Sequence, residues 1–275
     1  MTLSTIRNNP AKQKKVKTKK QKAIAATCAV AFWLLVWHVV SLCVGSELVL
    51  VSPVKVVQTL FTVIFDPDFL KTVWYSAARI LGGFFIALTL GTVLGWVASR
   101  FWVVETLLRP ITAVIKATPV ASFIILVLLW FSGKNLSVII SMLMVFPVIY
   151  MNVLEGIRSA DEELLEMAQV FRLSVSKKLL YIYLPAVAPF FVSACSVSLG
   201  LCWKSGIAAE VIGTPDGSIG AVFYQAKIFL QTSELLAWTV VVVAVSVAFE
   251  KLFMLLLRLV LKKLKMEDVL NGKRA

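Results

Sequence analysis

Residues 155–189 read EGIRSADEELLEMAQVFRLSVSKKLLYIYLPAVAP, a charged segment between two long uncharged runs. The run before it holds 20 uncharged residues between Lys134 and Glu155, and the run after it holds 25 between Lys178 and Lys204. A helix that spans a bilayer needs about 20 predominantly apolar residues. The charged segment is therefore predicted to be a loop that joins two membrane-spanning helices.

The other uncharged runs extend this pattern along the chain. They hold 24, 20, 17 and 15 residues and lie between Lys22 and Glu47, Arg79 and Arg100, Lys116 and Lys134, and Glu234 and Glu250. The last run continues into apolar residues beyond Lys251, so its full length is also adequate. The fold class is thus predicted to be all-α, a polytopic membrane protein with about six transmembrane helices. The first run is expected to be an uncleaved signal anchor.

Composition supports a membrane protein and excludes several other classes. Hydrophobic residues make up 59% of the 275 residues, charged residues 16%, and the mean hydropathy is +0.88. Soluble domains average about 45–50% apolar and about 25% charged residues. The excess of apolar residues excludes a disordered chain, a collagen-like fibre and a small disulfide scaffold. Four cysteines without a CxxC pair, together with a single histidine, give no pattern for a metal site.

The net charge of +13 is interpreted as a topology signal rather than a nucleic-acid footprint. Lysines and arginines gather in residues 1–22, in residues 258–274 and in the segment that follows Arg158. Short loops on the cytoplasmic side of membrane proteins are enriched in these residues. Both termini and the 155–189 loop are therefore predicted to lie in the cytoplasm.

Local patterns predict finer features of the spans. Gly91 and Gly95 form a GxxxG pair that permits close helix packing. Pro119 and Pro147 are expected to kink their helices. Apolar residues at helical spacing after Pro53 predict a short helix on the outer membrane surface, with its stripe formed by Val54, Val57, Leu60, Phe61 and Ile64.

The 155–189 loop is predicted to contain a short amphipathic helix. Ser159 and Glu162 have the spacing of a capping box, so the helix is expected to begin near Ser159. Its first turn is acidic, which suits the helix dipole. One face is expected to carry an apolar stripe of Leu164, Leu165, Ala168 and Phe171. Membrane-surface helices are usually basic, so this acidic one is predicted to dock into a groove on a soluble partner.

The same loop resembles the cytoplasmic EAA loop of ABC-importer permeases. The matching residues are Glu166, Ala168, Ile182, Leu184 and Pro185. Two positions depart from that pattern, because Met167 stands at the second position of the triplet and Arg172 stands where glycine is usual. The second departure affects the turn after the helix, where a left-handed backbone favours glycine. Residues 74–100, 109–110, 117–119, 202–213 and 217–220 also resemble the permease branch that handles sulfonates, taurine and nitrate.

This resemblance implies a type I ABC-importer permease architecture. The lysines and arginines of residues 1–22 predict a basic cytoplasmic arm. The resemblance implies a permease domain over 23–275, with a core of about 72–262 and a coupling loop over 156–178. It also implies two permease copies, expected as a homodimer, two ATPase subunits and an external substrate-binding protein at a bacterial inner membrane. The residues expected to couple to the ATPase are Ser159, Glu162, Leu164, Leu165, Glu166, Ala168, Phe171 and Arg172.

The chain is not expected to be an enzyme, and no catalytic or metal-binding residues are predicted. Gly133-Lys134 and Gly272-Lys273 lack the rest of a phosphate-binding loop, so ATP is expected to bind to the partner ATPase. The expected cargo is a sulfonate, taurine, nitrate or a similar small anion. A permease for a vitamin precursor or another small solute, and a membrane scaffold without transport, remain as alternatives. Co-purification of an ATPase would exclude the scaffold.

Pathway residues are predicted after the fifth run. Trp203, Lys204 and Glu210 lie beside Gly206 and Gly213, which predicts an interrupted helix that lines a cavity. The alternative is that Lys204 and Glu210 form a charged pair in an outward-facing loop.

Overall fold

The computed structural model describes residues 19–264, and all regular structure in that part of the chain is helical. Of the predicted arm over residues 1–22, residues 1–18 therefore lie outside the described residues. The elements are α1 (Lys19–Val44), α2 (Pro53–Ile64), α3 (Phe69–Arg100), α4 (Trp102–Ala117), α5 (Val120–Trp130), α6 (Gly133–Arg158), α7 (Glu162–Val170), α8 (Val175–Lys178), the π-helix η1 (Leu179–Tyr183), α9 (Leu184–Gly213), α10 (Ile219–Ile228) and α11 (Thr232–Lys263). The all-α prediction is confirmed.

Five helical segments within residues 19–264 are long and apolar enough to cross a membrane, and six if a bent pair counts as one. The five are α1, α3, α6, the continuous segment 175–213 and α11. The prediction of about six spans is thus confirmed. The third predicted span, between Lys116 and Lys134, is not a straight helix, because α4 and α5 meet there at 109°. Pro119 causes the break, since it holds Thr118 in an extended conformation with φ −81° and ψ 131°. Pro147, in contrast, lies inside an unbroken α6.

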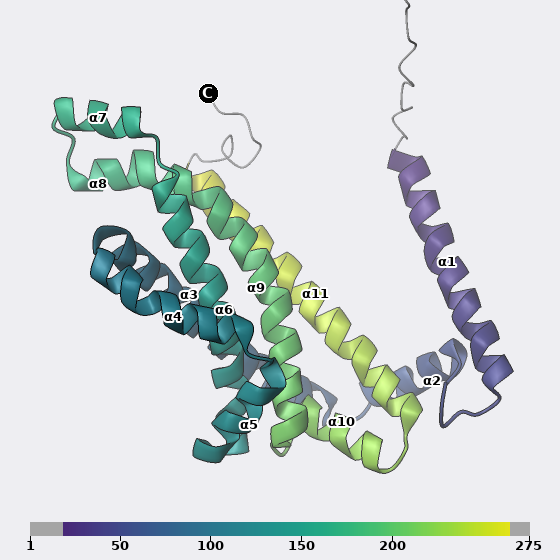
Figure 1. Ribbon diagram of the computed structural model, residues 1–275. Coiled ribbons are helices and arrows are strands. Elements are labelled where there is room, and N and C mark those ends of the chain that lie inside the picture. Colours follow the sequence, from purple (N-terminus) through teal and green to yellow (C-terminus); the bar gives the residue numbers. More distant parts are fainter. Residues whose placement is uncertain (1–18, 265–275) are drawn as a thin grey trace, which may run out of the picture.

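The centre of the molecule is the stack of α3, α6 and α9 (Figure 1). Gly91 and Gly95 face α6 as the GxxxG pair predicts. A Cβ at Gly91 would lie 3.0 Å from Ile149, and one at Gly95 would lie 3.0 Å from the carbonyl oxygen of Tyr150. The backbones therefore approach more closely than a larger residue would allow. The buried apolar residues between these helices include Ile80, Phe84, Val145, Ile149, Cys195 and Leu199.

The first two helices lie at the side of this stack. Helix α1 stands apart, and its closest neighbour is α2 (Figure 1). The hydroxyl of Ser41 donates to the carbonyl of Leu50, in the segment that leads to α2, at 3.0 Å. The predicted helix after Pro53 is confirmed as α2. It packs against α11 through the buried Val56 and Val63, and most of the predicted stripe is exposed instead.

One end of the molecule gathers the elements that the sequence assigns to the cytoplasm. The start of α1, the end of α11 and the α7–α8 hairpin lie at that end, and α2, α5 and α10 lie toward the other (Figure 1). The arrangement places the two ends of the described chain on the same side as the charged loop.

Candidate functional site

The charged loop folds into a hairpin of α7 against the segment from α8 to the start of α9. Its helix begins at a different cap from the one predicted. Asp161 is the N-cap of α7, and its carboxylate accepts a hydrogen bond from the backbone N–H of Glu163 at 2.9 Å. Ser159 instead ends α6, and its hydroxyl donates to the carbonyl of Gly156 at 2.9 Å. The predicted Ser159–Glu162 capping box is wrong, because Ser159 has ψ 1° and an N-cap needs the extended backbone found at Asp161.

The turn after α7 forms in spite of the missing glycine. Arg172 has a φ of 47°, in the left-handed region. The N–H of Leu173 donates to the carbonyl of Ala168 at 2.9 Å, and the N–H of Arg172 donates to that of Gln169 at 3.0 Å. These two bonds define a Schellman motif, in which Leu173 also packs against Ala168. Arg172 therefore adopts the backbone conformation that glycine would adopt more easily.

The predicted apolar stripe on α7 is divided between two faces. Ala168 is fully buried, and Leu165 packs with it against Ile182 and Tyr183 of the returning segment. Leu164 and Phe171 point outward, and Phe171 is 71% exposed at the C-cap. The four residues do not form one surface, because Leu165 and Ala168 are used for packing inside the hairpin.

The outward face gains two residues that the stripe missed. Met167 and Val170 are exposed beside Leu164 and Phe171. We call these four residues, Leu164, Met167, Val170 and Phe171, the outer α7 face. Glu162 and Glu166 are exposed on the same short helix, so the outer α7 face has an acidic border. This is a surface that a protein partner with an apolar groove and a basic rim would fit.

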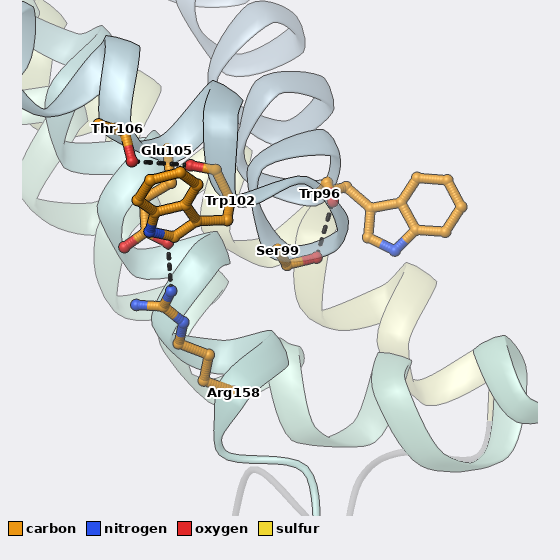
Figure 2. A network of polar contacts seen from close by, with 6 residues as sticks. All are labelled: Trp96, Ser99, Trp102, Glu105, Thr106 and Arg158. Carbon is orange, nitrogen blue, oxygen red and sulfur yellow. Dashed lines mark hydrogen bonds and ion pairs between the residues drawn. The ribbon is translucent and has the colours of Figure 1, made fainter.

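An ion pair braces the base of the hairpin. Figure 2 shows the guanidinium of Arg158, the last residue of α6, reaching the carboxylate of Glu105 in the first turn of α4. The pair ties the end of α6 to the corner between α3 and α4, next to the start of α7. Sequence reasoning missed it because the two residues are 53 positions apart. The sequence carried one indication of this pair. An acidic residue near the start of a helix and a basic residue at the end of another each interact favourably with the helix dipole.

The predicted interruption of the pathway helix is wrong. Helix α9 runs without a break from Leu184 to Gly213. Gly206 serves close packing instead, since a Cβ there would lie 2.6 Å from Ile80 and 2.7 Å from the hydroxyl of Ser141. The alternative of a charged pair in an outer loop is also wrong, because Lys204 and Glu210 both lie within α9.

The three predicted pathway residues have different surroundings. Trp203 is buried, and its indole N–H has no hydrogen-bond partner among the described residues. Lys204 is exposed on the surface of α9. Glu210 is fully buried near the end of the helix. The structure therefore does not bring the three side chains together at one surface.

Glu210 joins three helices. Its Oε2 accepts hydrogen bonds from the hydroxyl of Ser76 in α3 at 2.6 Å and from the N–H of Gly220 in α10 at 3.3 Å. The same Ser76 hydroxyl accepts a bond from the N–H of Ile219 at 2.9 Å. Gly220 lies so close to Glu210 that a Cβ could not be accommodated without movement. We call Ser76, Glu210, Ile219 and Gly220 the Glu210 junction.

Comparison with known proteins identifies the kind of protein that carries these features. The family model for the inner-membrane component of binding-protein-dependent transport systems matches residues 87–266. That range contains the hairpin, all of α9 and three members of the Glu210 junction. The chain belongs to this family.

Several relatives named as transport permeases match over most of their length. A putative aliphatic sulfonates transport permease of Bacillus subtilis is 29% identical over 232 residues, covering 83% of each chain. The corresponding permease of Escherichia coli is 34% identical over 230 residues, covering 78% of this chain and 82% of its own. The taurine transport permease of Escherichia coli is 27% identical over 220 residues, covering 78% and 80%.

The family match confirms the main prediction from the sequence. The chain is the transmembrane permease subunit of an ABC importer in an inner membrane, and this family works with an ATPase and a substrate-binding protein. It is a family of transport permeases rather than of enzymes. The alternative of a scaffold without transport has no support from these relatives.

Proposed function

We propose that this permease imports a small anion of the sulfonate, taurine or nitrate type and receives its ATPase on the outer α7 face. The relatives named above carry sulfonates and taurine, and a nitrate import permease of Synechocystis is 26% identical over 214 residues. The observation that carries the docking proposal is an apolar surface on a helix whose opposite face is already buried.

The outer α7 face has the properties of a docking surface. Phe171 and Val170 are 71% and 79% exposed at the charged end of the molecule, beside Arg172 and the acidic residues of α7. Burying a side chain of this size contributes about 1.5–3 kcal/mol. The Schellman turn and the Ala168 contact hold the helix in one orientation, so movement of the partner would displace the hairpin as a unit. In this proposal ATP binds to the ATPase alone.

Lys204 is the proposed pathway residue. It lies nine positions before the end of α9, about 13 Å inside the helix at 1.5 Å per residue. A cation exposed at that depth is costly against lipid and is expected to face protein or a water-filled cavity. A lysine there would favour an anionic cargo over a neutral or cationic vitamin precursor. We propose that a second copy of the chain covers this face of α9 and completes the pathway as a homodimer.

We also propose that the hairpin end of the molecule is cytoplasmic. Basic residues at that end include Arg100, Arg158, Lys177, Lys178, Lys262 and Lys263. At the other end, Lys55, Lys71, Lys134 and Lys227 are accompanied by Glu47, Asp66, Asp68, Asp216 and Glu234. Lysines and arginines are therefore more numerous at the hairpin end, which supports cytoplasmic termini by the positive-inside rule.

Substitution of one exposed phenylalanine tests the docking proposal. Phe171→Asp should release the ATPase in a detergent pull-down, because it places a charge in the proposed apolar contact. Phe229→Asp is the matched control, since Phe229 is 70% exposed at the other end of the molecule. The control should retain the ATPase. If Phe171→Asp also retains it, with full stimulation of ATP hydrolysis by the binding protein, the outer α7 face is not the docking site.

A second substitution tests the pathway independently of docking. Lys204→Gln should reduce uptake of the anionic cargo while the ATPase stays bound, because Lys204 makes no contact with the hairpin. Uptake equal to wild type would remove Lys204 from the pathway and leave the docking proposal unaffected.

A further inference from the structure

An apolar pocket opens at the base of the hairpin, and none of its lining residues belongs to the outer α7 face or to the Glu210 junction. Its volume is about 190 Å³, and it lies between α3, α6, η1 and the start of α9. Trp96 comes from α3, Val153 and Ile157 from α6, and Leu179 and Val187 from the chain that returns from the hairpin. The exposed wall is entirely apolar.

The apolar wall determines what kind of molecule the pocket can hold. A water molecule needs polar partners to be held in a cavity, and this wall offers none. Trp96, which is half exposed, and Tyr183 both line the pocket. Tryptophan and tyrosine are enriched where the bilayer meets water. Their presence on the wall favours a pocket at the depth where an acyl chain joins its headgroup.

The surroundings of the pocket are basic. Arg100 lies one helical turn beyond Trp96 on the same face of α3, because residues four apart on a helix are neighbours. Arg100 is exposed and makes no ion pair within the described residues. Lys177 and Lys178 directly precede Leu179 of the wall. Of the nearby acidic groups, Glu105 is already paired with Arg158. Glu155 lies two residues from both Val153 and Ile157 and therefore on another face of α6.

The π-helix η1 forms part of the wall. It supplies Leu179 and Tyr183, and its wider turn interrupts the regular packing of the segment that runs from α8 into α9. Single π-helical turns occur frequently at functional sites. Here the irregular turn lies where the pocket opens.

We propose that this pocket binds one acyl chain of an anionic phospholipid, whose phosphate is held by Arg100 with Lys177 and Lys178. The charge complementarity of the mouth selects an anionic headgroup over a zwitterionic one. The lipid is a constituent of the bilayer rather than cargo, and the proposed site shares no residue with the outer α7 face or with Lys204.

Native mass spectrometry of the full-length permease tests the proposal. The detergent-purified protein is mixed with equal amounts of phosphatidylglycerol and phosphatidylcholine that carry the same chains. Wild type should retain phosphatidylglycerol preferentially. Arg100→Gln should lower that preference about fivefold, the effect typical of one basic residue close to anionic lipid. Lys227→Gln, at the exposed end of α10, is the matched control and should leave the preference unchanged.

A second variant tests the acyl-chain part of the site. Thr92 lines the pocket, and its hydroxyl donates to the carbonyl of Leu88 in its own helix, so replacing it breaks no hydrogen bond between helices among the described residues. Thr92→Phe should fill the pocket and abolish retention of both lipids, and Leu179→Phe serves if Thr92→Phe does not fold. Equal retention of the two lipids by wild type, an unchanged preference in Arg100→Gln, or full retention by a folded pocket-filling variant would each overturn the proposal.

Discussion

Replacement of Glu210 tests whether this buried carboxylate acts through its charge or through its hydrogen bonds. Both bonds that it accepts from other helices end on one oxygen, Oε2. The other oxygen, Oε1, has no partner among the described residues, and the buried hydroxyl of Ser137 also lacks one there. A glutamine retains one acceptor oxygen, and its amide could donate to Ser137. An alanine retains neither function.

The expected magnitudes follow from these contacts. Glu210→Ala removes the acceptor of Ser76 and of the Gly220 N–H, which are both buried. An unsatisfied buried group costs about 1–3 kcal/mol in water-soluble proteins. Hydrogen bonds inside membranes contribute less, on average about 0.6 kcal/mol. Two lost bonds and the cavity left by the side chain should therefore lower the free energy of unfolding by about 2–3 kcal/mol. Glu210→Gln should change it by less than about 1 kcal/mol.

Thermal unfolding of the purified permease and uptake by the reconstituted importer together distinguish the two roles. A structural junction predicts that Glu210→Ala lowers both the unfolding midpoint and uptake, whereas Glu210→Gln stays close to wild type in both. A charged pathway residue predicts a different pattern, in which Glu210→Gln unfolds normally and loses uptake. That second pattern would refute the assignment of Glu210 to the junction between α3, α9 and α10.

Three further predictions concern the hairpin and its base. Arg172→Gly should raise the stability of the hairpin by about 1 kcal/mol, because glycine adopts a φ of 47° without the cost that a side chain adds; hydrogen exchange at α7 measures it. Asp161→Ala should increase exchange in α7 through loss of a cap of about 0.5–2 kcal/mol, and Ser159→Ala should change it less. Glu105 and Arg158 are partly exposed, so a double-mutant cycle on thermal unfolding should give a coupling energy of no more than about 1 kcal/mol.

The sequence was sufficient for features that depend on hydrophobicity and local spacing. Uncharged runs located the spans, because the cost of placing charge in a bilayer is independent of how the helices pack. The GxxxG pair at Gly91 and Gly95 indicated a close contact, and the structure supplies the partner, α6. The helix after Pro53 was predicted from its periodicity, although which of its faces packs against α11 was not.

The errors arise where tertiary contacts determine the outcome. The Ser159–Glu162 spacing satisfies the capping-box pattern, but α6 continues up to Ser159 and occupies the position that the cap would need. The stripe on α7 was treated as one surface because a sequence does not show that Ala168 faces Ile182 of the same hairpin. The α4–α5 break, in contrast, lies at Pro119, where a kink was predicted, although the count of uncharged residues placed a single span across it.

An uninterrupted α9 changes how the hairpin and the Glu210 junction are related. The helix begins at the hairpin, where Ala186 packs beneath α7, and it ends beside the Glu210 junction. It is 30 residues long, which is about 45 Å at 1.5 Å per residue. A break at Gly206 would let the two ends move separately. Gly206 is instead packed closely against Ile80 and Ser141, which holds the unbroken α9 against α3 and α6. If the ATPase displaces the hairpin as proposed, the displacement reaches α10 through one stiff helix and the bonds of Glu210. Loss of those bonds should therefore weaken the response at the far end of the molecule while the ATPase stays docked.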